Sequence, residues 1–421
     1  MLKITRVLLC ICALFVVLQG CATGRDSLDK SEGEPKPIEP AAGISEEIPE
    51  GMNYASIFQE DYDELWQLLD DNYPFFSVYE SRGIDIEQVR VAYGEMVENR
   101  ATDLYSFVEV LKQMFRELDY FAHLNVVDYG TYQTYCDAMT DPARDRSGSA
   151  AWNEVLFNAQ TVAAYEMLKT ISSGMQADYP EIETAWYPEI NTAYFHIRTM
   201  AGAVVERDQE MIESYLSGLE HVENVIIDIT GNSGGSTRYM QEVIINPFGG
   251  TYSYKDYIFL GKTPVNEKYY WDEMGMPSPV SELPQDAPNP SFLEEFGMDY
   301  FGESGVRIEG KPQTEEWMTA SRWVLIDEMV YSSADTFARF CKKTGWATLV
   351  GRVTKGDGDG QGPVFVSLSN TGLLIQFSST TGINLDGSCN TVYGTAPDIL
   401  AVKGKWPLEL CKELILEHGD Q

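Results

Sequence analysis

The chain is poor in positive charge. Lys and Arg together number 30 against 65 Asp and Glu residues, which gives a formal net charge of −35 over 421 residues. Phosphate backbones carry the same sign of charge, so such a surface argues against nucleic acid as a partner. We expect most of these carboxylates to form a solvated, soluble exterior.

The chain also lacks the cysteine spacing that is typical of a zinc site. Three of its seven cysteines lie within the first 21 residues, and the other four form no C-x-x-C pair: Cys136, Cys341, Cys389 and Cys411. Structural zinc sites are normally built from closely spaced ligand pairs. The sequence therefore predicts no metal centre, and it leaves open whether any two of these cysteines form a disulfide.

A long apolar run is missing as well. The apolar stretch Val7–Val17 is shorter than the roughly 20 residues that a membrane-spanning helix needs. Two basic residues precede it and a Leu-Gln-Gly-Cys motif ending at Cys21 follows it, which is the order of a bacterial lipoprotein signal. We predict a signal peptide over residues 1–20 and lipidation of Cys21, with an ordinary N-terminal anchor helix as the alternative. The mature chain would be held in the cell envelope outside the cytoplasm, with a membrane as its partner through the lipid.

The next part of the chain changes from polar to helical. Residues 21–53 are rich in Asp, Glu, Ser, Pro and Gly, which is typical of a flexible linker. Apolar residues then recur every three or four positions, which predicts a small helical N-terminal domain over 54–128. Asp85 is expected to cap one of its helices, because Gln88 follows three residues later. Residues 129–184 carry no motif and are interpreted as a connecting segment.

Beyond residue 185, short apolar runs of strand length alternate with helical stretches. The expected strands are 193–198, 225–229, 323–327, 346–350, 364–368 and 373–377. Such alternation predicts an α/β domain over 185–405, with a polar, Pro-containing and irregular insertion at 262–320. A C-terminal helix is expected within 406–421.

Two segments join a buried strand directly to a tight polar turn. The first, over 225–236, reads V-I-I-D-I-T-G-N-S-G-G-S. Without side chains, Gly234 and Gly235 expose backbone N–H groups of the kind that stabilise a developing oxyanion. A plain turn between a strand and a helix is the alternative.

The second segment, over 323–340, reads W-V-L-I-D-E-M-V-Y-S-S-A-D-T-F-A-R-F. Ser332 falls at the start of the helix that follows the turn, where the helix dipole and free N–H groups favour negative charge. This placement suits a nucleophilic serine and also an ordinary serine N-cap, a role that Ser333 could fill as well.

Together these segments resemble peptidase family S41, which includes the C-terminal processing and tricorn-like proteases. Residues Asp228–Gly235 are similar to the family's D-L-R-x-N-x-G-G, and residues 330–335 are similar to its T-x-S-S-A-E. Further along, Gly351–Gly356 and Gly394–Ile399 resemble the family's G-E-x-T-x-G and G-x-x-P-D-I, in the same order.

The resemblance implies an α/β fold with a ClpP/crotonase-like core behind the small helical domain. It also implies a serine peptidase that cleaves exported or unfolded polypeptides, without a metal or organic cofactor. Ser332 would be the nucleophile, because it lies three residues before Asp335, which stands at the family's Glu. The N–H groups of Gly234, Gly235 and Ser333 would form the oxyanion hole.

The general base should be one of only four histidines. Tricorn-like members carry their base in a motif similar to L-x-D-x-x-H, and residues 118–124 read L-D-Y-F-A-H-L. The resemblance therefore implies that His123 is the base, and histidine suits that role near neutral pH. A structural histidine is the alternative at this position. The other three lie in an expected strand, before a strand and in the tail: His196, His221 and His418.

Two departures from the family pattern leave the third member of a triad open. Asp357 stands where processing proteases carry a catalytic Lys, and the acid expected a few residues before Gly394 is missing. Asn390 or Asp386 could instead orient the imidazole. An inactive, S41-like surface lipoprotein that binds peptides or other ligands is therefore the alternative to a peptidase. The sequence leaves the cleavage specificity and the oligomeric state open.

Overall fold

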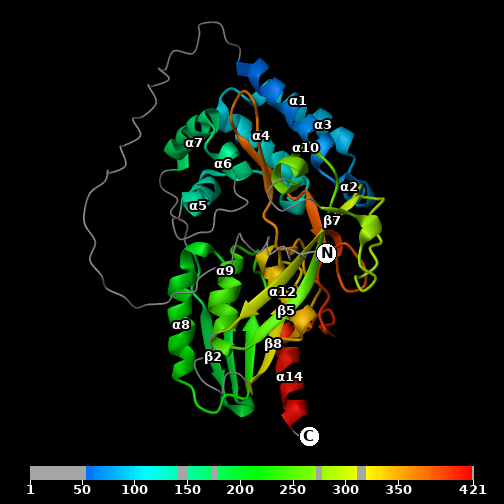
Figure 1. The fold of residues 1–421 in the computed structure, drawn as a ribbon. Helices are drawn as coiled ribbons and strands as arrows, with labels where there is room; N and C mark the ends of the chain where they lie inside the picture. The colour runs from blue at the N-terminus through cyan, green and yellow to red at the C-terminus, as the bar shows by residue number, and fades with distance from the viewer. Residues whose placement is uncertain (1–53, 141–149, 173–178, 272–276, 311–318, 420–421) are drawn as a thin grey trace, which may run out of the picture.

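The computed structural model describes residues 54–140, 150–172, 179–271, 277–310 and 319–419 (Figure 1). The predicted signal peptide, Cys21 and the linker lie outside these residues. Within the described ranges, no helix combines the length and the apolar character that crossing a membrane requires. Two lobes make up the fold, drawn one above the other in Figure 1.

Helices with one apolar face dominate the upper lobe. The first four are α1 (Tyr54–Asn72), α2 (Phe76–Ser81), α3 (Ile86–Arg100) and α4 (Leu104–Glu117). The Asp85 carboxylate accepts the Gln88 N–H at 3.0 Å, so the predicted N-cap is confirmed. These helices form the helical N-terminal region that the sequence predicts.

Three more helices occupy the segment interpreted as a connection: α5 (Tyr129–Thr140), α6 (Ala150–Leu156) and α7 (Ala159–Ser172). Their buried side chains join the core of α1–α4. That core also takes in buried residues of 257–301 and 364–389. We call it the mixed core, because helices and antiparallel strands both contribute to it.

A three-stranded antiparallel sheet lies in the mixed core, in the order β1-β11-β10. Its strands are β1 (Asn125–Val126), β10 (Val364–Ser367) and β11 (Leu374–Phe377). The sequence predicts β10 and β11 as strands but assigns them to the α/β domain. In the structure β11 also pairs with β1, which follows the first four helices, so these two strands lie beside the helical region.

The lower lobe is built on a six-stranded sheet in the order β13-β9-β8-β4-β3-β2. Its pairings are parallel except that of β2 with β3. The strands are β2 (Glu183–Tyr187), β3 (Thr192–His196), β4 (Asn224–Asp228), β8 (Ser321–Ile326), β9 (Thr348–Gly351) and β13 (Ile399–Leu400). The fold is therefore the α/β arrangement that the sequence predicts.

Helices cover both faces of this sheet (Figure 1). Side chains of α8 (Val205–Ser217) and α12 (Ser333–Thr344) pack on one face, and those of α14 (Pro407–Gly419) pack on the other. We call this assembly the parallel-sheet core. Parallel strands point their carboxyl ends to one edge, so the loops that follow β4, β8 and β9 meet there.

Two long strands join the lobes: β5 (Thr251–Leu260) and β7 (Tyr300–Glu309). They pair antiparallel along their whole length, with β12 (Thr380–Gly382) and β6 (Ser278–Pro279) beside them. Tyr257 and Phe301 belong to the mixed core, whereas Tyr252 and Ile308 pack with the parallel-sheet core. The prediction that 262–320 is irregular is thus wrong over β7.

The remaining elements are single turns or short helices. They are η2 (Phe121–His123), η3 (Pro188–Ile190), η4 (Gly202–Val204), α9 (Thr237–Tyr239), η5 (Met240–Ile245), η6 (Asn246–Phe248), α10 (Pro264–Asn266), η7 (Glu267–Trp271), η8 (Val280–Glu282) and α13 (Asn390–Tyr393).

Candidate active site

Ser332 and His123 meet where the two lobes face each other. Ser332 ends the loop between β8 and α12, and His123 ends the turn η2 that follows α4. The His123 Nε2 atom lies 3.1 Å from the Ser332 Oγ atom, although 209 positions separate them in the chain. Both residues are half-buried, so the pair remains open to solvent on one side.

Asp357 completes the row of side chains. Its Oδ2 atom lies 2.6 Å from His123 Nδ1, and its side chain is 1% exposed. An ionised carboxylate can only accept hydrogen bonds, so Nδ1 donates and Nε2 is left with its lone pair toward Ser332. The three side chains therefore stand in the order of a serine-protease triad.

Hydroxyl groups surround the Asp357 carboxylate. Tyr331 and Ser378 each donate to Oδ2 at 2.8 Å, and Thr391 donates to Oδ1 at 3.1 Å. Burial by itself raises the pKa of Asp357, but the interaction with His123 and the donated hydrogen bonds outweigh it and hold the pKa below its usual value. Asp357 is therefore ionised at neutral pH.

The backbone is strained at each of these three side chains. His123, Ser332 and Asp357 have φ angles of 56°, 55° and 62°, in the left-handed region that side chains with a Cβ disfavour. In the described part of the chain eight non-glycine residues have positive φ, and six lie at this site: Asp119, Tyr120, Ala122, His123, Ser332 and Asp357. Strain of this kind costs about 1–3 kcal/mol per residue and gathers at functional sites.

The turn after β4 lies against Ser332. A Cβ on Gly234 would stand 2.7 Å from the Tyr331 carbonyl oxygen and 3.0 Å from Ser332 Cβ, so this position requires glycine. The Gly234 N–H, however, donates to Asn232 Oδ1 at 2.8 Å. The expectation that this N–H serves the oxyanion hole is therefore wrong.

Two of the expected oxyanion donors remain available. In the part of the chain that the structure describes, neither the Gly235 N–H nor the Ser333 N–H donates a hydrogen bond. The Ser333 hydroxyl donates to the Gly235 carbonyl oxygen at 2.9 Å and so ties the two segments together. Ser332 stands at the N-cap position of α12, yet its side chain makes no capping hydrogen bond. Its hydroxyl is thus directed to His123 rather than to the helix.

Neither residue that the sequence offers as the orienting group touches His123. Asn390 donates to Asp335 Oδ2 at 2.9 Å and accepts the Gly358 N–H at 2.8 Å. The exposed Asp386 accepts hydrogen bonds from Ser388 at 2.6 and 3.0 Å. The prediction of Asn390 or Asp386 is therefore wrong in geometry, and Asp357 occupies that place.

The loop that carries Asp357 is held by α12. Asp335 accepts the Thr354 hydroxyl at 2.5 Å, and Arg339, one turn later, donates to the Gly358 carbonyl oxygen at 2.7 Å. Asn390 joins Asp335 to the Gly358 N–H. The helix that begins at the candidate nucleophile thus fixes both sides of the candidate acid.

The sequence does contain a signal for Asp357. It stands where processing proteases of the family carry the lysine that reaches their nucleophile. From that place the Asp357 carboxylate contacts His123 Nδ1 at 2.6 Å, so it can orient the histidine. Lys355, two residues earlier, instead pairs with Asp119 at 3.3 Å.

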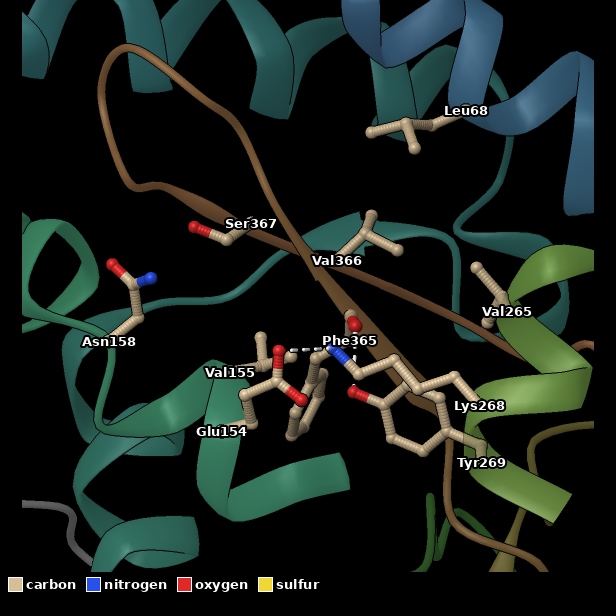
Figure 2. Close-up of a pocket in the computed structure, with 10 residues that line it drawn as sticks. All are labelled: Leu68, Glu154, Val155, Asn158, Val265, Lys268, Tyr269, Phe365, Val366 and Ser367. Carbon is tan, nitrogen blue, oxygen red and sulfur yellow. Dashed lines mark hydrogen bonds and ion pairs between the residues drawn. The ribbon is translucent and has the colours of Figure 1, made fainter. Parts of the chain in front are cut away.

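His196 and the cavity shown in Figure 2 lie away from Ser332, His123 and Asp357. His196 Nε2 contacts the Thr230 carbonyl oxygen at 3.0 Å, and no cluster of metal ligands occurs among the described residues. A cavity of about 250 Å³ lies between α1, α6, η7 and β10, walled by apolar side chains such as Leu68 and Phe365 (Figure 2). The Lys268–Glu154 ion pair (3.2 Å) stands at this cavity, which contains none of the residues named above.

Several solved structures match the chain at low sequence identity. A candidate peptidase from Parabacteroides merdae ATCC 43184 is 18% identical, with 86% of this chain and 98% of that chain covered and a TM-score of 0.49. A lipoprotein from Streptococcus agalactiae is 9% identical, with coverages of 86% and 96% and a TM-score of 0.45. Mature CPAF is 14% identical, with coverages of 82% and 93% and a TM-score of 0.46. No curated protein sequence matches the chain.

Two family models match the chain. The Tricorn protease C1 domain matches residues 55–116, and Peptidase family S41 matches residues 191–401. The second match spans half of the chain and includes Ser332, Ser333, Gly235 and Asp357. The chain therefore belongs to peptidase family S41.

Proposed function

We propose that the chain is a serine peptidase that hydrolyses peptide bonds with Ser332 as nucleophile, His123 as general base and Asp357 as the orienting acid. The observation that carries the proposal is the pair of contacts on one imidazole. Nε2 lies 3.1 Å from Ser332 Oγ, and Nδ1 lies 2.6 Å from Asp357 Oδ2. No metal or organic cofactor takes part in this scheme.

The chemistry follows from the proton positions. Ser332 Oγ attacks the carbonyl carbon of the scissile bond while its proton passes to His123 Nε2. The imidazolium that forms is stabilised by the Asp357 carboxylate. It then returns the proton to the leaving amine, and the acyl-enzyme is hydrolysed by a water that the same base activates.

The developing oxyanion needs donors that are already in place. We assign this role to the N–H groups of Gly235 and Ser333, whose segments are joined by the Ser333 hydroxyl. Each such donor is typically worth about 10²–10³-fold in rate.

The substrate and the place of action are inferred from the sequence. We propose exported or unfolded polypeptides as substrates and acylation at Cys21 as the membrane attachment. Metabolic labelling with a fatty-acid analogue tests the attachment, with Cys21→Ala as the matched variant. Equal labelling of both proteins would contradict it.

The alternative of an inactive binding module has lost its main support. It rested on the missing acid before Gly394, and Asp357 is a buried, ionised carboxylate in contact with the imidazole from another loop. This arrangement favours turnover over simple binding.

A fluorophosphonate probe, which reacts with activated serines, tests the assignment of the nucleophile. Wild type and Ser333→Ala should be labelled, because alanine keeps the backbone N–H, whereas Ser332→Ala should not. Hydrolysis of fluorescently labelled casein should follow the same order. Circular dichroism serves as the folding control. Labelling that persists in Ser332→Ala would place the nucleophile elsewhere, and a folded wild type without label would favour the binding module.

A further inference from the structure

The Tyr331 hydroxyl contacts two of the three triad residues, His123 and Asp357. Tyr331 itself directly precedes the third, Ser332, in the chain. The hydroxyl accepts the His123 backbone N–H at 2.8 Å and donates to Asp357 Oδ2 at 2.8 Å. The phenol ring lies beside the imidazole, with 4.7 Å between ring centroids. A single hydroxyl carries one donor and two acceptor positions, so both contacts can form together.

The main chain holds this tyrosine in place. The Tyr331 N–H donates to the Asn232 carbonyl oxygen at 3.1 Å, and the next N–H, of Ser332, donates to the Gly356 carbonyl oxygen at 3.0 Å. Lys355 N–H in turn donates to the Val330 carbonyl oxygen at 2.8 Å. The backbone around Tyr331 is therefore paired with the loop that carries Asp357.

His123, by contrast, arrives from the mixed core on a strained turn. Its φ of 56° costs free energy that other contacts must offset. The hydrogen bond from its N–H to Tyr331 is one such contact, and it joins the two lobes at the imidazole.

We propose that Tyr331 is a positioning residue for the triad. Its hydroxyl fixes the His123 backbone against the Asp357 carboxylate and takes up part of the negative charge that faces the imidazole. This inference rests on the proposed peptidase function.

The hydroxyl is a permanent donor. Burial, together with the nearby Asp357 charge, raises the pKa of Tyr331 well above its usual range, so the phenol stays protonated at any working pH. Without it the carboxylate would lose one of its three hydroxyl donors and attract the imidazolium more strongly. A higher pH would then be needed to obtain the neutral base.

Tyr331→Phe tests the proposal in the full chain, with the rate of fluorophosphonate labelling measured from pH 4 to 9. We expect the maximal rate to fall about 10-fold and the acid side of the profile to move up by about half a pH unit or more. Replacing Tyr331 with 3,5-difluorotyrosine keeps the shape but makes the hydroxyl a stronger donor. That variant should move the acid side in the opposite direction, and it remains informative if Tyr331→Phe does not fold.

Tyr165→Phe is the matched control. The Tyr165 hydroxyl also accepts a backbone N–H, from Leu374 at 3.3 Å, and donates to a backbone oxygen, of Val127 at 2.8 Å, without touching the triad. Its loss should leave the profile in place.

The outcomes distinguish the positioning role of Tyr331 from the proposed peptidase function. Labelled wild type with unshifted profiles in both Tyr331 variants would overturn the positioning role alone. An equal loss of rate in Tyr331→Phe and Tyr165→Phe, with no shift in either, would make Tyr331 merely structural. A folded wild type that takes no label would overturn the proposed function, and this inference with it.

Discussion

The two cores contribute to the candidate site in different ways. The parallel-sheet core presents Ser332, Ser333 and Gly235 in loops that directly follow β8 and β4. The mixed core presents His123 on a turn with four strained residues, held by groups from outside its own helices. Besides the Tyr331 hydroxyl, these include the Ser378 N–H, which donates to the Ala122 carbonyl oxygen at 2.7 Å.

The difference separates two requirements of the site. The nucleophile and its oxyanion donors need only a strand, a turn and a helix start, all within a few residues. The base needs the two lobes to be docked, because its contacts with Ser332 and Asp357 cross 209 and 234 positions of the chain. Asp357 stands between these cases, in a loop that leaves β9 in one core and enters β10 in the other.

The largest loss of activity should follow from removing His123, the residue that the mixed core contributes to the site. His123→Ala removes the base and should lower kcat/KM by about 10³-fold or more, because nothing else takes the Ser332 proton. His196→Ala is the matched control in the lower lobe, since His196 Nε2 lies 3.0 Å from the Thr230 carbonyl oxygen and 4.0 Å from Asp228 Oδ1. Casein hydrolysis by folded variants distinguishes them. Loss of turnover in His196→Ala, with His123→Ala active, would reverse the assignment.

Removing the charge of Asp357, in the loop between the cores, should lower activity slightly less than removing His123. Asp357→Asn keeps the shape but removes the charge and allows the imidazole to adopt the wrong tautomer, so kcat should fall about 10²–10⁴-fold with little change in KM. Asp386→Asn, at an exposed carboxylate that accepts hydrogen bonds from Ser388, should retain wild-type kcat. If the two variants behaved alike, Asp357 would have no special part in turnover.

The same loop should make stability depend on pH. Burial, and then the Asp357 charge, raise the pKa of Asp359 to about 7. An Asp in the unfolded chain titrates near 4, so between about pH 4 and 7 the folded protein holds a proton on Asp359 that the unfolded chain has lost. The contribution of Asp359 to the free energy of unfolding is therefore highest at low pH and falls as the pH rises through about 7. Asp359→Asn removes this loss, and its stabilising effect should be about 2 kcal/mol larger at pH 8 than at pH 5.

Thermal unfolding at the two pH values measures this effect. Asp386→Asn is again the control, because serine hydrogen bonds lower the pKa of that exposed carboxyl. It should show no stabilisation at pH 8. If Asp359→Asn stabilised the protein equally at pH 5 and pH 8, ionisation of the Asp359 carboxyl would not destabilise the fold.

The smallest effect concerns the strain stored at the nucleophile. Ser332 has φ 55° and ψ −126°, a conformation that suits glycine. Ser332→Gly should therefore be more stable than Ser332→Ala by about 1 kcal/mol, although both lack the nucleophile. Urea unfolding of the two variants measures the difference. Equal stability would show that the surrounding backbone relaxes around Ser332.

Local structure can be predicted from the sequence alone. The Asp85 cap, the first helices, four strands of the parallel sheet (β3, β4, β8 and β9) and the turns that carry Ser332 and Gly235 all follow from patterns a few residues long. Such patterns work because hydrogen bonding and the burial of one face are decided by near neighbours. Even β10 and β11 were predicted as strands, although not their partner β1.

Tertiary structure decided what depends on distant partners. Asp357 lies in a loop and Asn390 begins the short helix α13, and only the packing of α12 places Asp357 at the imidazole and Asn390 one contact behind it. The loss of the Gly234 N–H to the Asn232 side chain, two residues earlier, is by contrast a local contact of the kind that Asn makes in turns. A residue's chemistry at this site is set by the group it faces, and for His123 and Asp357 that group comes from another part of the chain.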